Sequence, residues 1–108
     1  MKDRSIQIKA LSSQTRIEIL RLLVSPQTHF SHQWSADPAE FGVCISLIAE
    51  ALELSQPTVS RHIDLLRQAG FLSSRRFQKW SYCKRNEENL AEYHNWLAGA
   101  LSIREPVG

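Results

Sequence analysis

The sequence predicts a mainly α-helical protein with one small β-hairpin. Apolar residues recur at helical spacing over residues 41–54 and again over 56–70. Strand-favouring residues follow, in two runs joined by a turn near Gln78-Lys79. At 108 residues the chain has the length of one domain, so we expect these elements to share one core.

The first predicted helix runs from about Ser13 to Val24. Ser12 or Ser13 can cap it, and Pro26 ends it. The apolar residues before it, between positions 6 and 11, form an arm that extends the same apolar surface.

Residues 25–40 contain two prolines and many small polar residues, which predict a loop or a short strand with turns. A loop of this length is long for a compact domain, so it is a candidate for a functional or mobile segment. Residues 41–54 then predict a short helix or a pair of helices, and Leu54 is expected to pack in the following turn.

The next helix begins at Ser55 or Gln56, where either side chain can cap it, and Pro57 fits its first turn. Gly70 ends it, as a glycine just past a helix commonly does. The residues expected to face the core are Val59, Ile63, Leu65 and Leu66.

Two strands, over residues 71–77 and 80–85, and a last helix over residues 87–102 complete the predicted elements. The apolar stripe of the last helix consists of Leu90, Tyr93, Leu97 and Leu101, widened by Trp96 and Ala100.

Two helices joined by a short turn over residues 45–70 are typical of a helix-turn-helix, whose second helix places its N-terminal residues in the major groove of DNA. Glutamine can pair with adenine, arginine with guanine, and serine or threonine with several groups. For His62, a phosphate contact and a packing role are equally open. The residues predicted to contact DNA from this helix are Gln56, Pro57, Thr58, Ser60, Arg61 and His62.

The hairpin places Arg75, Arg76, Gln78 and Lys79 near its tip. Cationic side chains there can follow the phosphates or enter a minor groove, and we favour this DNA-contacting role. The alternative is a solvated, charged edge that prevents strand aggregation.

Charge distribution agrees with phosphate binding. Residues 55–85 hold seven basic residues and one acidic residue, a net charge of +6, although the whole chain has only +2. A basic region in an otherwise acidic protein indicates a nucleic-acid partner.

These segments together resemble the ArsR/SmtB family of winged-helix repressors. The likeness is carried by LSSQTRIEILRLL, IAEALELSQPTVSRHIDLLRQAGFL and RRFQKWSYCKR, and it extends from about residue 10 to 101. Gln14 stands where the family usually has proline. The resemblance implies a winged helix-turn-helix with a three-helix DNA-binding core, and a homodimer on a palindromic double-stranded operator.

The same resemblance divides the chain into functional segments. We expect residues 1–108 to form a single domain, with the helix-turn-helix at about 45–70 and the wing at about 71–85. The first and last helices, at about 12–24 and 87–102, would form the dimer interface, as they do in the family.

Many members of the family release DNA on binding a metal ion or after thiol oxidation. A Cys-x-Cys site of the family reads Cys44-Ile45-Ser46 here, and a hydroxyl is a poor ligand for a soft ion. On the last helix, Glu92-Tyr93-His94 matches only half of another family site. His29 and His32 share a loop without a fixed carboxylate partner, so we expect no metal and no cofactor.

The sequence leaves two alternatives to this role. A thiol-responsive regulator using Cys44 is one alternative, although a Cys44–Cys83 bridge would need Cα atoms within about 7 Å. A winged-helix module that binds a partner protein is another. We expect no enzyme, since the sequence has no nucleophile–base pair and no phosphate-binding glycine loop. No apolar run approaches the ~18 residues of a membrane span and no signal peptide precedes the domain, so a cytoplasmic location is expected.

Overall fold

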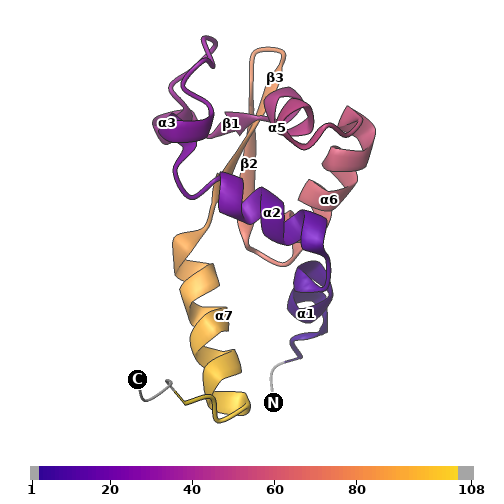
Figure 1. Cartoon of the computed structure of the whole chain (residues 1–108), viewed down its shortest axis with the longest axis vertical. Coiled ribbons are helices and arrows are strands. Elements are labelled where there is room, and N and C mark those ends of the chain that lie inside the picture. Colours follow the sequence, from indigo (N-terminus) through magenta and orange to yellow (C-terminus); the bar gives the residue numbers. More distant parts are fainter. Residues whose placement is uncertain (1–2, 105–108) are drawn as a thin grey trace.

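A computed structural model describes residues 3–104 and shows helices packed around a small antiparallel sheet (Figure 1). The predicted fold class, a winged helix-turn-helix, is confirmed. In chain order the elements are α1 (Ser5–Leu11), α2 (Gln14–Leu22), α3 (Pro26–His29), α4 (Pro38–Phe41), β1 (Val43–Cys44), α5 (Ile45–Leu52), α6 (Gln56–Gln68), β2 (Leu72–Phe77), β3 (Trp80–Arg85) and α7 (Glu87–Ala100).

The sheet has the strand order β1-β3-β2, and both pairings are antiparallel. Strands β2 and β3 form the long hairpin, and β1 adds two residues that pair Val43 with Cys83 and Cys44 with Tyr82. The wing therefore has an inner edge that is joined directly to the start of α5.

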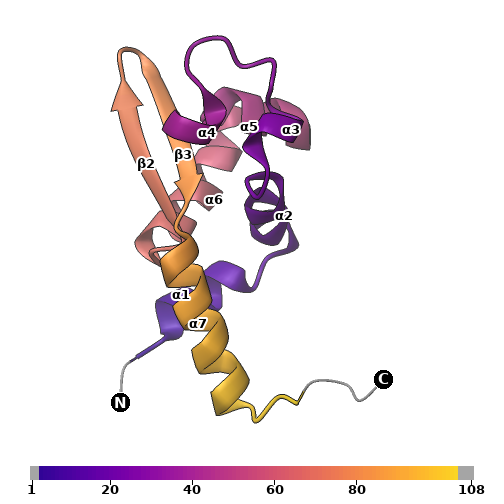
Figure 2. The same ribbon diagram turned by 90° about the vertical axis from the view of Figure 1, so that its left-hand side faces the viewer.

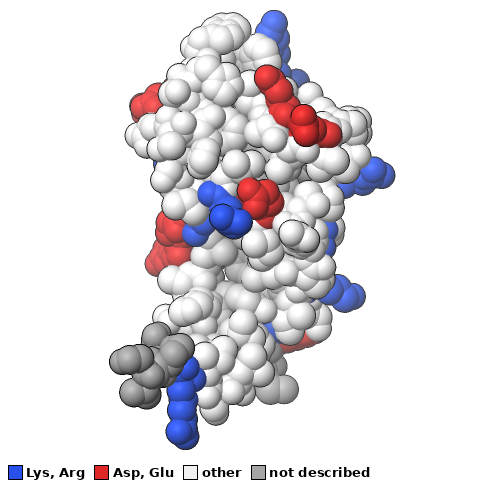
Figure 3. All heavy atoms as spheres, viewed as in Figure 1, with Lys and Arg blue, Asp and Glu red and all other residues white. Residues whose placement is uncertain are grey.

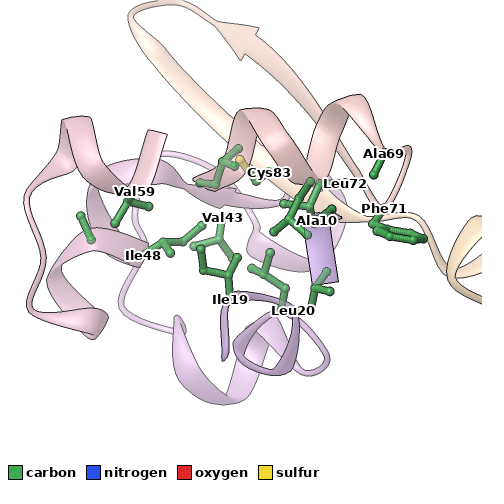
Figure 4. Close-up of a cluster of buried hydrophobic side chains, with 14 of the residues drawn as sticks. Ala10, Ile19, Leu20, Val43, Ile48, Val59, Ala69, Phe71, Leu72 and Cys83 are labelled. Atoms are coloured by element: carbon green, nitrogen blue, oxygen red, sulfur yellow. The ribbon is translucent and has the colours of Figure 1, made fainter. Parts of the chain in front are cut away.

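The core lies between α2, α5, α6 and the base of the wing (Figure 4). Ile19, Val43 and Ile48 point toward one another in this view, and all three side chains are fully buried. The helix-turn-helix is thus held from behind by α2 and from the side by the first strand.

The N-terminal region differs from its prediction. The apolar arm is a helix of its own, α1, and the helix expected over residues 13–24 is α2, which ends at Leu22. Ser13 is the cap, because its Oγ accepts a hydrogen bond from the Arg16 amide at 3.3 Å. Helix α1 packs on α6 as well as on α2, so it supports the helix-turn-helix directly.

Several other expectations differ from the structure. The segment over residues 25–40 holds two single-turn helices, α3 and α4, and the one over 41–54 holds strand β1 before helix α5. Leu65, expected in the core, is 43% exposed, and Leu54, expected to pack in the turn, is 39% exposed. The predicted domain limits at residues 1 and 108 lie outside the described residues.

Helix α6 ends in a backbone arrangement that fixes the start of the wing. The Gly70 amide donates to the Arg67 carbonyl and the Phe71 amide to the Leu66 carbonyl, which is the Schellman pattern. Gly70 has a φ of +83°, the left-handed conformation that this pattern requires. Asn89 of α7 donates from Nδ2 to the Gly70 carbonyl at 2.8 Å, so the end of α6 is tied to the start of α7.

Candidate nucleic-acid interface

Helix α6 begins with a hydrogen-bonded cap that leaves its first turn projecting from the body. The Ser55 Oγ accepts from the Thr58 amide at 3.3 Å and donates to the Thr58 Oγ1 at 2.8 Å. Pro57 occupies the first turn, where its missing amide proton costs nothing. Gln56 and Pro57 are exposed, whereas Thr58 is half-buried with its hydroxyl already engaged in the cap.

After its first turn, α6 has one side packed against the core and the other side exposed to solvent. Val59 and Ile63 are buried, and Arg61 is exposed on the opposite side. Ser60 is half-buried beside Arg61. Residues 56, 57, 60 and 61 thus share the outward surface that the sequence predicted for them, and their contact with DNA stays a prediction.

His62 is held by a residue that sequence reasoning did not find. The Arg16 guanidinium lies 3.0 Å from the His62 Nδ1 and also donates to the Ala10 and Lys9 carbonyls at the end of α1. Because a guanidinium only donates, Nδ1 must accept, and the neutral ring carries its proton on Nε2. Burial, followed by the charges of Arg16 and Arg61, lowers the pKa of His62 below its ordinary value.

The wing turns at Gln78 and Lys79. Gln78 adopts a left-handed conformation with φ of +57°, and the Lys79 ammonium lies 5.3 Å from the centre of the Trp80 ring. Both residues are exposed at the tip, so the structure places them where the sequence predicted.

The two arginines of the wing point to opposite faces of the hairpin. Arg75 pairs with Tyr82 across the strands, and its guanidinium stacks 4.1 Å from the centre of the Phe41 ring on α4. Arg76 pairs with Ser81, on the other face. Of these two arginines, only Arg76 therefore lies on the face of the hairpin that is nearest to α6.

A hollow of about 230 Å³ lies between α6 and the wing. Gln56 and Ser60 line it from α6, and Lys79 and Ser81 line it from the hairpin. The hollow therefore brings together polar side chains from two elements that are distant in sequence, and Ser81 shares its face of the hairpin with Arg76.

The +6 charge of residues 55–85 is less concentrated than the sequence suggests. Arg67 lies 3.7 Å from Asp64, Lys84 donates to the Glu40 carbonyl, and Arg85 donates to the Leu20 carbonyl. Lys and Arg side chains project along the edge formed by α6 and the tip of the wing (Figure 3). The remaining positive charge of this segment therefore lies chiefly on α6 and the hairpin tip.

Both cysteines are buried free thiols on opposite faces of the small sheet. Cys83 pairs with Val43, and Cys44 with Tyr82, so alternation directs the two sulfurs apart. Burial raises the pKa of the Cys83 thiol to about 12. The Cys44 Sγ lies 3.1 Å from the Ser46 Oγ, which is the hydroxyl that stands in the place of a second thiolate.

Within residues 3–104, no three His, Cys, Asp or Glu side chains gather into a group that could hold a metal ion. The rings of His29 and His32 each have their centre 6.4 Å from the centre of the Phe30 ring. The same residues include no helix long and apolar enough to cross a membrane.

The contributions of Arg16, Phe41 and Ser81 escaped sequence reasoning. Each acts through a partner distant in sequence, and only strand pairing or helix packing brings the partners together. The only sequence feature that could have indicated such a contact is Arg16 itself, because this charged residue interrupts the apolar face of its helix.

Comparison with known proteins agrees with this geometry. The model of a family of bacterial regulatory proteins, the arsR family, matches residues 43–74. The HTH-type transcriptional regulator YbzH of Bacillus subtilis is 36% identical over 89 residues, which cover 82% of this chain and 89% of that protein.

Two further similarities add to these. The arsenical resistance operon repressor of Escherichia coli is 36% identical over 73 residues, covering 67% of this chain but only 50% of the repressor. The homodimeric winged helix-turn-helix DNA-binding domain Mb0332 of Mycobacterium bovis superposes with a TM-score of 0.58 at 21% identity, over 93% of this chain and 87% of that domain. At this identity the likeness is one of fold.

Proposed function

This chain belongs to the arsR family of bacterial regulatory proteins, and we propose that it represses transcription by binding a palindromic operator as a homodimer. Each protomer presents α6 to one half-site, and the wing lies along the neighbouring backbone. The proposed role is binding, not catalysis, and its place is the cytoplasm, where the operator DNA is.

The observation that carries the proposal is the joint surface of α6 and the wing. Gln56 and Arg61 project from the first turns of a helix that is capped and buried behind, so their positions are set before DNA arrives. Lys79 completes the surface from the hairpin side of the same hollow. In a DNA-binding protein of this kind, the helix is expected to contact the bases and the wing to contact the phosphates.

The homodimer is supported by apolar side chains at the opposite end of the molecule, where α1 and α7 lie (Figure 2). Ile6 is 61% exposed and Leu101 is 64% exposed, and Ile8 and Ile103 are also largely exposed. Arg4 joins the two helices, because its guanidinium donates to the Glu92 carboxylate at 2.8 Å and lies over the Trp96 ring. Exposed apolar residues on two such elements are typical of a protein–protein interface.

The test begins with selection of bound duplexes from a random pool, followed by measurement of affinity by fluorescence anisotropy. We expect the selected site to be palindromic, with half-sites about one helical turn apart, or a multiple of it, and affinity to fall steeply with salt. The Gln56→Ala/Arg61→Ala variant should lose at least tenfold in affinity while it still dimerises.

The matched control is Gln27→Ala/Arg21→Ala, which removes the same side-chain types from exposed positions on α3 and α2. It should bind the selected site like the parent protein. Equal affinity of the parent and the Gln56→Ala/Arg61→Ala variant would show that α6 is not the reader and would favour a protein partner for this surface.

A further inference from the structure

A second pocket, of about 190 Å³, lies on the side of the sheet away from the core, between the loop after α3, the start of α5 and the hairpin. Trp34 and Trp80 form its walls, with ring centres 6.1 Å apart in an edge-to-face arrangement, and Leu47 contributes another apolar surface. Trp34 is 84% exposed, an unusual position for so large an apolar side chain.

Most polar groups of this pocket are neutral hydrogen-bonding groups. Ser35, Ser46 and Cys44 bring hydroxyls and a thiol to it, and the imidazole of His32 also lines it. None of the described residues that line it is Lys, Arg, Asp or Glu. Aromatic walls with a few neutral polar groups suit an uncharged organic molecule better than a metal ion or an anion.

The frame of the pocket is fixed by hydrogen bonds, although the segment has little regular structure. Gln33 is buried, donates to the Ala36 and Gly42 carbonyls, and accepts from the Cys44 amide at 2.8 Å. The Tyr82 hydroxyl donates to the Ser35 Oγ at 2.8 Å. The loop is thereby fastened to β1 and β3, so the pocket exists before any ligand enters.

The volume sets the size of a suitable ligand. A cavity of roughly 150 Å³ accommodates benzene, so about 190 Å³ leaves space for one ring with a small substituent. A hydroxyl or amide on that ring would find Ser35 or Ser46 as a partner.

The pocket adjoins the surface assigned to DNA. Trp80, Cys44 and Ser46 line both this pocket and the hollow that contains Gln56, Ser60 and Lys79. A ligand that moves the Trp80 ring therefore moves the neighbour of Lys79 and alters the hollow between α6 and the wing.

We propose that this tryptophan pocket is a regulatory site for a neutral, single-ring organic molecule that carries a hydroxyl or amide group. The regulatory part rests on the DNA-binding function proposed above. The ligand acts through Trp80, which is shared between the pocket and the DNA-facing hollow.

The test uses the full chain labelled with ¹⁵N and follows the indole N–H signals of its three tryptophans during titration. The probes are benzyl alcohol and benzamide, compared with charged molecules of similar shape, benzoate and benzylammonium. We expect the neutral probes to shift the Trp34 and Trp80 signals, leave Trp96 unmoved, and bind at least tenfold more tightly than the charged ones. Equal shifts at all three tryptophans, or no preference for neutral probes, would overturn the site.

The variant Trp34→Ala removes an exposed wall without disturbing the core, and Val24→Ala removes an exposed apolar side chain elsewhere. Trp34→Ala should weaken benzyl alcohol at least fivefold by the Trp80 signal, and Val24→Ala should not. Unchanged affinity in Trp34→Ala would also overturn the site.

DNA affinity measured with and without benzyl alcohol tests the regulatory link. We expect at least a threefold change in the parent and none in Trp34→Ala. Binding seen by the indole signals without any change in DNA affinity overturns the link through Trp80. Failure of every form to bind DNA would instead overturn the proposed function, while the indole signals would still decide the pocket.

Discussion

At Gly42 the backbone leaves no space for a side chain. Its φ is +94°, and a Cβ added there would lie 2.4 Å from the Cys83 carbonyl oxygen of the adjoining strand. Gly42→Ala should therefore lower the free energy of unfolding by about 2 kcal/mol or more, because both the backbone conformation and the strand contact are strained. Urea denaturation measures this change.

The chain offers a matched control for that substitution. Gly99 lies in α7, and a Cβ there would meet no atom within 4 Å. Gly99→Ala should raise the unfolding free energy by roughly 0.5–1 kcal/mol, since alanine favours the helix. If the two substitutions had similar effects, the close approach of β1 and β3 at Gly42 would be wrong.

His62 makes stability depend on pH. Its pKa in the folded protein is below the ordinary value of 6.5, so the unfolded chain takes up the proton first as pH falls. The unfolding free energy should accordingly decrease as pH drops below about 6.5, until the folded protein is protonated too. Denaturation from pH 7.5 to 5.5 should show a smaller loss in His62→Gln, while the exposed His94→Gln should behave like the parent.

Hydrophobic periodicity in the sequence predicted correctly which way some of the α6 side chains face, but not all of them. Residues 56, 57, 60 and 61 face outward because a helix that buries 59 and 63 must turn them away. Leu65 was assigned to the core by its residue type, although it follows Ile63 by two positions and so lies on another face of the helix. The Arg16–His62 contact joins residues 46 positions apart, and no local pattern reports such a pair.

At the scale of elements, the wing is a hairpin with two unlike faces. Arg75 lies against Phe41, whereas Arg76 shares its face with Ser81, beside α6. We expect Arg76→Ala to weaken operator binding more than Arg75→Ala and to reduce the slope of log affinity against log salt by about 1. Anisotropy titrations over a range of salt concentrations test this.

The unfolding free energies of Arg75→Ala and Arg76→Ala provide the control for this prediction. Arg75→Ala removes a cation–π contact and should lower the unfolding free energy by roughly 0.5–1 kcal/mol. Arg76→Ala should leave it nearly unchanged. A larger loss of DNA affinity in Arg75→Ala would contradict this assignment of the two faces.

The longer elements were predictable because their patterns span several turns or alternations. Helix α6, the hairpin and α7 lie within a few residues of their predicted bounds. Strand β1 was missed because two residues show no period, and its pairing with β3 is a long-range event. Helix α1 was seen only as an apolar arm, since seven residues without a side-chain cap carry a weak helical signal.

At the scale of the whole molecule, DNA affinity depends on the proposed dimer. Ile8→Asp/Leu101→Asp places charges among the exposed apolar residues of α1 and its neighbour α7, so it should shift the protein to monomers in sedimentation experiments. Operator affinity should then fall at least tenfold because one monomer reaches only one half-site.

Val24→Asp is the matched control, since Val24 is also exposed but lies beyond the end of α2. It should stay dimeric. A dimer that survives the Ile8→Asp/Leu101→Asp change would place the interface elsewhere. The resemblance to a known family supplied this interface as an expectation, but the composition of the chain alone did not, because exposed apolar residues are recognised only once the fold is known.

The hydrogen bond that the Asn89 side-chain amide donates to the Gly70 carbonyl has a consequence for the operator. It fastens the far end of α6 to α7, and the Phe71 carbonyl accepts from the Asn86 amide in the same corner. In a dimer built on α1 and α7, this rigid connection fixes the distance between the α6 helices of the two protomers. Loosening it should widen the range of half-site spacings that the protein accepts, while the bases preferred within each half-site stay the same.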